Sequence, residues 1–463
     1  MTISSDTAVA APPPGFAPQT DSKTAPVALR RQLSALSATM FGLSYICPSV
    51  VVSTFGVIAV RSAGAGALAY LIATIAMVLT AASYGRMAAR YPESGSAYTY
   101  VARTTNPTMG LVVGWVLILD YFFIPTVICL ITAKALEVLW PAISFHVWIF
   151  VVAILATVIN LLGIKVADRV NLTIMSAQLL AMALLMFFCA RYLHGTTPGP
   201  AAALTPVFSL APFHTSAANL PLVMAGAAIA CYSFLGFDAV STLSEETVNP
   251  TRNIPRATIL AAGAAGLIFV AAVYFLALAH PSLKFADVDN AGFEVLATAT
   301  GPVFSSAFTF VLIVSNLAAV VCAQAGCSRL LYAMARDNML PKTFFGYLSP
   351  KFRVPTLSIG LMGLVMLLGQ QLDIDTATSC VNFGAFSAFL AVNACVVLDR
   401  VGSRRALNVS AISLAAALVG ATASIWLIFS LSRMALTVGM IWLTLGLLYV
   451  GLRTRAIRGG AAR

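Results

Sequence analysis

Long apolar runs separated by short polar segments dominate the chain. A helix needs about 20 mostly apolar residues to cross the hydrocarbon core of a bilayer. Only helices or closed barrels satisfy every backbone polar group in hydrocarbon, and these runs are far too long for barrel strands. The pattern therefore predicts an all-α integral membrane protein with about 12 transmembrane helices, at 33–60, 66–89, 97–133, 146–164, 170–192, 220–247, 255–279, 293–334, 355–372, 374–398, 409–431 and 434–452.

The composition supports a lipid-embedded protein. Hydrophobic residues make up 60% of the 463 residues, charged residues make up only 9%, and the mean hydropathy is +0.92. A soluble domain carries about 25% charged residues. A chain with so few charges cannot cover a water-facing surface, so a soluble fold is excluded.

The distribution of basic residues predicts the orientation. If successive loops alternate sides, 22 of the 27 lysine and arginine residues fall on the side that holds both termini. The positive-inside rule then places both termini in the cytoplasm and the protein in the cell inner (plasma) membrane. The net charge of +11 reflects this topology and contact with anionic lipids. It does not indicate nucleic-acid binding, because the charges are spread over many short loops.

The domain organisation is simple. Residues 1–28, rich in Ala, Pro, Thr and Ser, are expected to form a disordered cytoplasmic tail and not a cleaved signal peptide. Residues 29–455 form a single transmembrane domain, and 456–463 a second cytoplasmic tail. All eight cysteines fall in the predicted spans without a CxxC pair, and the four histidines lack metal-ligand spacing. We therefore expect no disulfide framework, metal or cofactor.

Two predicted helices are interrupted at equivalent positions. The first contains FGLSYICP at 41–48, with Gly42 and Pro48, and the sixth contains SFLGFD at 233–238, with Gly236. Breaks in spanning helices are tolerated where they line a cavity. The first five helices (repeat one, about 33–192) can then be laid on the next five (repeat two, about 220–398) with opposite topology. This 5+5 inverted repeat with two extra C-terminal helices (about 409–452) is a transporter plan.

Acidic residues are rare within the predicted spans. Asp120 lies midway along the third helix and Asp238 follows the second break. A charge at a helix centre costs about 2.5–3.5 kcal/mol on insertion scales and commonly marks a substrate or ion pathway. We expect Glu245 and Glu246 to have a structural role, because Arg252 and Arg256 lie close enough in sequence to form ion pairs with them. Aromatic rings beside a carboxylate suit an ammonium group, and the aromatic residues adjacent to the breaks or to Asp120 are Tyr45, Tyr121, Tyr232 and Phe237.

Four motifs make the chain resemble the amino acid–polyamine–organocation superfamily of permeases, most closely its bacterial putrescine importers. They are YPESGSAYTY at 91–100, SFLGFDAVSTLSEET at 233–247, SRLLYAMARDNMLP at 328–341 and VNFGAFSAFLAVN at 381–393. The resemblance implies secondary transport by alternating access and no enzymatic activity. By matching positions, it implies a substrate site at Gly42, Leu43, Ser44, Tyr45, Asp120, Tyr121, Tyr232, Ser233, Gly236, Phe237 and Asp238. Coupling or gating candidates are Asp120, Asp238, Glu245, Glu246, Glu93, Ser328 and Arg329.

The leading hypothesis is import of a small cationic amine, putrescine-like, coupled to protons. The first break carries a single glycine and bulky neighbours, which disfavours binding of a substrate carboxylate and favours an amine. Putrescine importers tend to have an acid near Ser53, which a serine cannot replace, and some proton-coupled relatives have a lysine where Gln178 stands. An amino acid permease or exchanger is therefore the alternative. A channel or a sensor without flux is a third reading, and the oligomeric state is left open.

Overall fold

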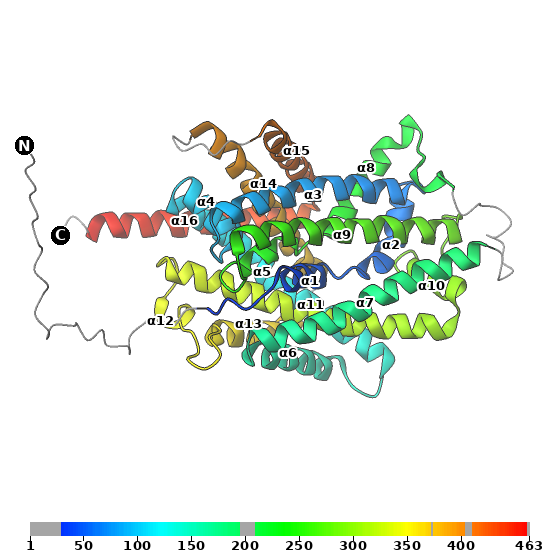
Figure 1. The fold of residues 1–463 in the computed structure, drawn as a ribbon, viewed down its shortest axis with the longest axis horizontal. Coiled ribbons are helices and arrows are strands. Elements are labelled where there is room, and N and C mark those ends of the chain that lie inside the picture. Colours follow the sequence, from blue (N-terminus) through cyan, green and yellow to red (C-terminus); the bar gives the residue numbers. More distant parts are fainter. Residues whose placement is uncertain (1–28, 195–208, 372–373, 403–409, 461–463) are drawn as a thin grey trace, which may run out of the picture.

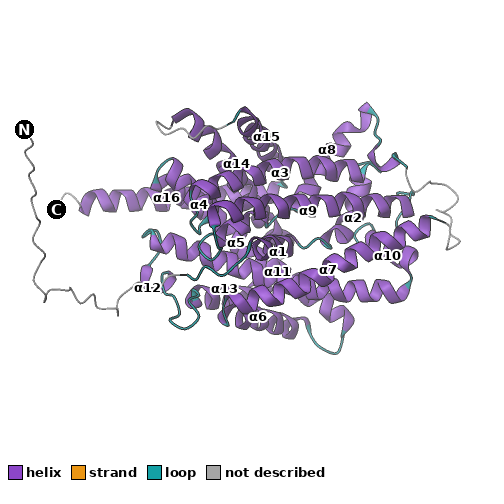
Figure 2. Ribbon diagram, viewed as in Figure 1, coloured by secondary structure: helices purple, strands orange, loops and turns teal. Residues whose placement is uncertain are grey.

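The fold is all-helical, as the sequence predicts (Figures 1 and 2). It is known from a computed structural model that describes residues 29–194, 209–371, 374–402 and 410–460. Apart from one isolated bridge between Leu33 and Thr247, these described residues form no β-structure. The α-helices are α1 (Ala35–Ile46), α2 (Val50–Arg61), α3 (Gly66–Arg90), α4 (Ser96–Thr104), α5 (Pro107–Leu139), α6 (Phe145–Leu161), α7 (Ile164–Leu193), α8 (Leu220–Tyr232), α9 (Pro250–Ala279), α10 (Ala291–Thr300), α11 (Pro302–Arg336), α12 (Lys342–Phe345), α13 (Thr356–Leu368), α14 (Ile374–Gly402), α15 (Ala411–Phe429) and α16 (Arg433–Gly460). Short 3-10 helices are η1 (Ala211–Phe213), η2 (Ala217–Asn219), η3 (Phe237–Leu243) and η4 (Gly369–Gln371).

The spanning helices agree with the sequence pattern. Within the described ranges, nine helices are long and apolar enough to cross a bilayer, and the bent pair α1 and α2 makes a tenth. Two shorter apolar helices, Phe145–Leu161 and Thr356–Gln371, fall at the predicted fourth and ninth positions. The chain is a multi-pass membrane protein. The predicted N-terminal tail, 1–28, lies outside the described residues. Of the predicted C-terminal tail, 456–463, residues 456–460 continue α16 and 461–463 lie outside the described residues.

Two of the predicted spans each contain two separate helices. The third, at 97–133, divides into α4 and α5, because Asn106 caps α5 and Pro107 begins it. The eighth, at 293–334, divides into α10 and α11, since Gly301 adopts φ +81° and Pro302 starts the next helix. Proline is favoured at the first turn of a helix but cannot continue one. Hydrophobicity alone does not show the boundary between α4 and α5 or that between α10 and α11, because the residues on both sides are largely apolar.

The two ends of the bundle carry different elements. In Figure 1, α4, α12 and the C-terminal part of α16 lie at one end, and α2 and α10 lie toward the other. We call these the α4 end and the α10 end. The α4 end is the one that the basic residues predict to face the cytoplasm.

The order of elements repeats along the chain. A broken helix (α1 with α2, then α8 with η3) is followed by a long helix (α3, then α9) and by a short helix leading into the longest ones (α4 and α5, then α10 and α11). Related helices pack together: α3 lies along α9, and α5 along α11. The broken α1 lies at the centre, against α9, α11 and η3.

Candidate functional site

The first break is shorter than the sequence predicts. Gly42, Leu43, Ser44 and Tyr45 belong to α1, and the helix ends only at Ile46. Cys47 then takes a left-handed conformation (φ 54°), and α2 leaves at 49° to α1. The expected break over 41–48 is wrong at its start, because Pro48 lacks an N–H and ends the helix only near its own position. Gly42 instead allows close packing, since a Cβ there would lie 2.5 Å from Val240 Cγ2.

A side-chain amide from α7 stabilises this break. Gln178 Nε2 donates to Ser49 Oγ at 2.6 Å and lies 3.4 Å from Cys47 Sγ. The Cys47 thiol also lies 3.3 Å from Asn316 Oδ1 on α11. All four residues are buried. Gln178 therefore holds the bent segment in place.

The second break faces the first. α8 ends at Tyr232, Gly236 adopts φ +112°, and η3 begins at Phe237. This agrees with the predicted break at 233–238. The Tyr45 ring packs directly against Gly236, where a Cβ would lie 2.1 Å from Tyr45 Cδ1. Only glycine permits both this backbone conformation and this contact.

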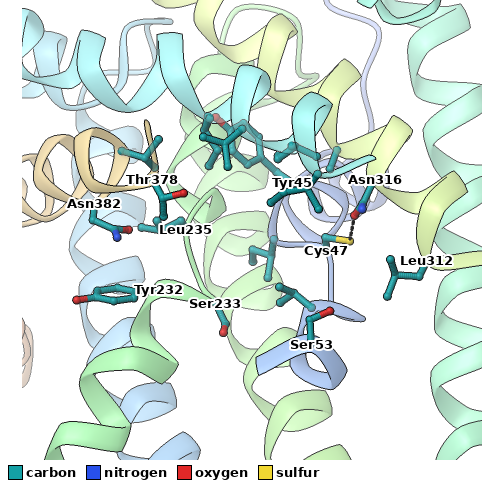
Figure 3. Close-up of a pocket in the computed structure, with 18 residues that line it drawn as sticks. Tyr45, Cys47, Ser53, Tyr232, Ser233, Leu235, Leu312, Asn316, Thr378 and Asn382 are labelled. Carbon is teal, nitrogen blue, oxygen red and sulfur yellow. Dashed lines mark hydrogen bonds between the residues drawn. The ribbon is translucent and has the colours of Figure 1, made fainter. Parts of the chain in front are cut away.

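A cavity of about 280 Å³ opens at the junction of the two breaks (Figure 3). Its walls come from the α10-end halves of α5, α11 and α14 together with α2 and both breaks. They are mostly apolar, with a few polar groups from each side. The lining residues are Tyr45, Ile46, Cys47, Val50, Ser53, Ile124, Val127, Ile128, Ile131, Tyr232, Ser233, Leu235, Leu312, Asn316, Ala319, Thr378, Val381 and Asn382.

The two predicted acids lie close together beside Tyr45 rather than in the cavity wall. Tyr121 donates its hydroxyl hydrogen to Asp238 Oδ2 at 2.9 Å. Asp120 is 3% exposed, and its Oδ1 has no hydrogen-bond partner among the described residues. Both carboxyl groups interact electrostatically with Tyr45, which itself lines the cavity. Tyr45 thus belongs both to the cavity and to the surroundings of the acids.

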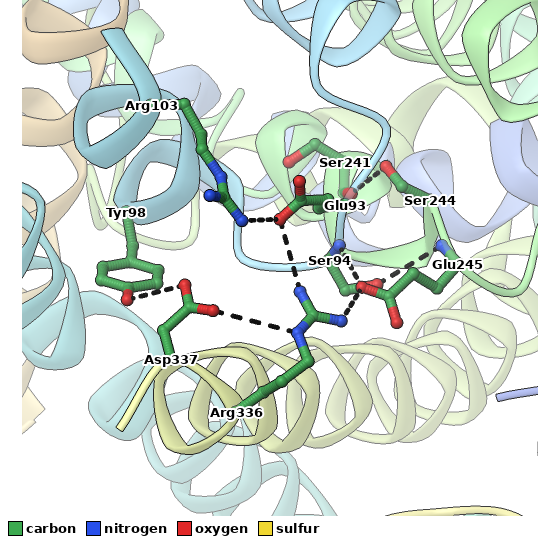
Figure 4. A network of polar contacts seen from close by, with 9 residues as sticks. All are labelled: Glu93, Ser94, Tyr98, Arg103, Ser241, Ser244, Glu245, Arg336 and Asp337. Carbon is green, nitrogen blue, oxygen red and sulfur yellow. Dashed lines mark hydrogen bonds and ion pairs between the residues drawn. The ribbon is translucent and has the colours of Figure 1, made fainter. Parts of the chain in front are cut away.

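The α4 end is closed by a network of ion pairs (Figure 4). Arg336 pairs with Glu245 at 2.6 Å and with Glu93 at 3.5 Å, and Arg103 also pairs with Glu93, at 2.9 Å. The Ser94 amide donates to Glu245 Oε1 at 2.9 Å. The network joins the loop before α4 to the end of η3 and to α11.

Two further contacts complete this closure. The Tyr98 hydroxyl donates to Asp337 Oδ2 at 3.0 Å. Burial and the neighbouring Asp337 raise the pKa of the Tyr98 hydroxyl, which therefore remains a donor. Arg329 forms a buried ion pair with Glu246.

The expected pairing of Glu245 and Glu246 with Arg252 and Arg256 is wrong. Their partners are Arg336 and Arg329 of α11. Arg252 and Arg256 are exposed on α9, because the chain turns after η3 and Pro250 starts a new helix. Sequence proximity selected the wrong arginines, since the correct ones come from a helix distant in sequence.

The predicted substrate residues divide into three groups, and the gating candidate Ser328 lies apart from them. Tyr45, Tyr232 and Ser233 line the cavity. Asp120, Tyr121, Gly236, Phe237 and Asp238 are packed behind it. Gly42, Leu43 and Ser44 are buried in α1, and Ser328 hydrogen-bonds within α11.

Sequence reasoning missed several polar lining residues. They are Cys47, Asn316, Thr378 and Asn382. The lone amides of Asn316 and Asn382 in apolar helices were the available signal, because polar groups at membrane depth face cavities or partners. Ser53, noted only for the acid it replaces, also lines the cavity.

Comparisons with known proteins agree with this architecture. The family model described as amino acid permease matches residues 38–453. The chain is 36% identical to the low-affinity putrescine importer PlaP of Escherichia coli (strain K12) over 94% of this chain and 96% of that protein. It is 26% identical to the branched-chain amino acid permease BcaP of Bacillus subtilis (strain 168), over 80% and 81% of the two chains. It is 25% identical to the methylthioribose transporter of the same organism, over 92% and 94%. The chain belongs to the amino acid permease family, and it is a transporter and not an enzyme.

Proposed function

We propose that this protein imports a small cationic amine, putrescine-like, by alternating access coupled to protons. The observation that carries the proposal is the cavity at the junction of the two breaks, which coexists with a closed α4 end. A carrier must present its site to one side while the other is sealed. If the α4 end faces the cytoplasm, as the basic residues predict, the arrangement is the outward-facing state that loads substrate for import.

The cavity offers groups suited to an ammonium ion. Tyr45 and Tyr232 supply aromatic faces, which attract cations. Tyr232 is fixed by stacking on Phe386, with ring centroids 5.3 Å apart. The amide and hydroxyl oxygens of Asn316, Asn382 and Thr378 can accept hydrogen bonds from an amine.

The acid pair supplies the coupling. In the proposed cycle the amine enters against Tyr45, and displacement of that ring from Gly236 brings the ammonium group toward Asp120 and Asp238. Two adjacent buried carboxyl groups do not readily ionise together, so the pair takes up one proton from outside while its ionised member binds the ammonium group, and both are released when the α4 end opens. Rocking of the repeat breaks the Glu93–Arg336–Glu245 contacts and opens the α4 end.

An amino acid permease or exchanger is the second candidate. No acidic side chain lines the cavity among the residues described, which suits a zwitterion as well as a monoamine. The similarity to a branched-chain amino acid permease points the same way. The largely apolar walls would then hold the side chain of the amino acid.

Uptake into proteoliposomes tests the proposal. Labelled putrescine and leucine are offered with and without an imposed pH gradient, and unlabelled amines and amino acids compete. We expect saturable putrescine uptake that a gradient acid outside accelerates, and counterflow, which a channel does not show. Competition that requires a carboxylate on the competitor would instead identify an amino acid permease. If Asp120→Asn and Asp238→Asn both reach the membrane and both transport at the wild-type rate, the proposed coupling is wrong.

A further inference from the structure

A second, strongly basic cavity lies apart from the cavity at the two breaks. Its volume is about 150 Å³, and segments far apart in sequence meet around it. They are the stretch before α1, the turn between α6 and α7, the residue Glu246 after η3 and the loop before α13. The cationic residues that line it are Arg30, Lys165, Lys351 and Arg353.

These four cations lack acidic partners. Within the described part of the chain, none of them has a carboxylate within 4.0 Å. Glu246 also lines the cavity, but its carboxylate is engaged by Arg329. Arg353 Nε is buried without a hydrogen-bond partner. Like charges gathered around one hollow repel each other, and a bound anion relieves that repulsion.

The backbone adds to the positive potential. Gly163 (φ +101°) lines the cavity and precedes α7, a helix of 30 residues whose N-terminus has no side-chain cap. A helix N-terminus favours an anion and presents free amide hydrogens to it. Lys165, in the first turn, lies where an acidic residue would be favourable in the absence of a ligand.

We propose that this cavity binds a phosphate group, supplied by the headgroup of an anionic phospholipid or by a soluble phosphate anion. Phosphate is the multivalent oxyanion that several cations and a helix N-terminus together recognise. Lys165 and Lys351 are exposed at the rim and Arg353 reaches deeper, so the ligand enters from the surface of the α4 end.

The site has a structural consequence. The amides of Gln32 and Leu33 donate to the Glu246 carbonyl at 2.7 and 2.9 Å. A phosphate held between Arg30 and the loop at 351–353 links the same stretch before α1 to the loop before α13. The bound anion therefore adds to the contacts that hold the stretch before α1 in place.

Binding by the full-length purified protein tests the proposal in two arms. In the first, inorganic phosphate is titrated at constant ionic strength and the unfolding temperature is followed. In the second, native mass spectrometry compares retention of phosphatidylglycerol with that of phosphatidylcholine. Saturable binding of phosphate identifies a soluble ligand, and selective retention of phosphatidylglycerol identifies a lipid headgroup.

Paired variants locate the binding. Lys165→Gln with Lys351→Gln should weaken it by at least about tenfold, while Lys165→Arg with Lys351→Arg retains it. The matched control is Arg252→Gln with Arg256→Gln, which removes two exposed charges at the same end but outside the cavity. The control should stay within about twofold of wild type. The proposal is overturned if neither probe binds saturably, or if both glutamine pairs weaken binding equally.

Discussion

At the residue scale, the two buried acids have different surroundings. The Asp238 carboxyl group accepts a hydrogen bond from the Tyr121 hydroxyl, and backbone amides at Gly236 and Ala239 also donate to it. Asp120 Oδ1 has no partner among the described residues, although the residue is buried. Their presence at the breaks follows from the sequence, since acids are rare in apolar helices. Their unequal hydrogen bonding does not, because it depends on residues from α5 and η3 that only folding brings together.

This asymmetry predicts different effects of two conservative substitutions on stability. Asp238→Asn replaces a carboxyl oxygen with an NH₂ group, which cannot accept hydrogen bonds from the surrounding backbone amides. The free energy of unfolding should therefore fall by about 1–3 kcal/mol. Asp120→Asn removes a carboxyl group that lacks a full set of partners, so stability should not fall. Both variants should lose amine uptake. Thermal unfolding in detergent, measured beside proteoliposome uptake, separates the two effects, and equal destabilisation by both substitutions would contradict the assignment.

The backbone conformation of Gly236 and its contact with Tyr45 both require a glycine at this position. Gly236→Ala forces a left-handed alanine and a Cβ into the Tyr45 ring, so either the ring or the break must move. We expect a loss of about 1–3 kcal/mol of stability and nearly complete loss of transport. Gly360→Ala on α13 is the control, because a Cβ there meets nothing within 4 Å. Wild-type uptake by Gly236→Ala would show that the Tyr45 contact is dispensable.

At the element scale, the breaks explain both the success and the errors of the sequence prediction. Both broken helices were expected from Gly and Pro in apolar runs. The start of the first break was placed too early, because the residues before Pro48 remain compatible with a helix. Likewise, α4 and α10 were merged with the helices that follow, since apolar length alone does not show a bend at Asn106 or Gly301.

We expect α7 to stabilise the first break, because its residue Gln178 contacts Ser49 and Cys47 there. Gln178→Ala leaves Ser49 and Cys47 without their amide donor in a buried site. The expected cost is about 1–2 kcal/mol of unfolding free energy, with reduced uptake. Ser176→Ala, on the same helix but exposed and bonded only to its own helix backbone, is the control and should resemble wild type. Indistinguishable unfolding temperatures for the two variants would remove Gln178 from this role.

At the scale of the whole molecule, the cavity and the ion-pair network lie on opposite sides of the breaks. The network joins α11 to the loop before α4 and to the end of η3, so in the proposed cycle it opens when substrate leaves at the α4 end. The sequence names Glu93 and Glu245 as gating candidates and proposes the segment 328–337 for the gate, but it does not single out Arg336 or Arg103 as their partners. The sequence alone explains basic residues near loops by the membrane orientation of the chain. Only the packing of α11 on η3 shows which arginines form ion pairs with Glu93 and Glu245.

We therefore expect Arg336 to influence the balance between the two faces. Arg336→Gln removes its contacts with Glu93 and Glu245 and should favour the opened α4 end by about 1 kcal/mol, which is about a fivefold shift in population. A cysteine at Ser53, which lines the cavity, reports the shift through labelling by a membrane-impermeant maleimide added outside. The labelling rate should fall in the Arg336→Gln background but not with Lys134→Gln, which removes an exposed pair with Glu137 elsewhere. Because the ion pairs and the cavity are separated in space, an unchanged rate in both backgrounds would mean that the two faces are not coupled, and alternating access through these breaks would have to be abandoned.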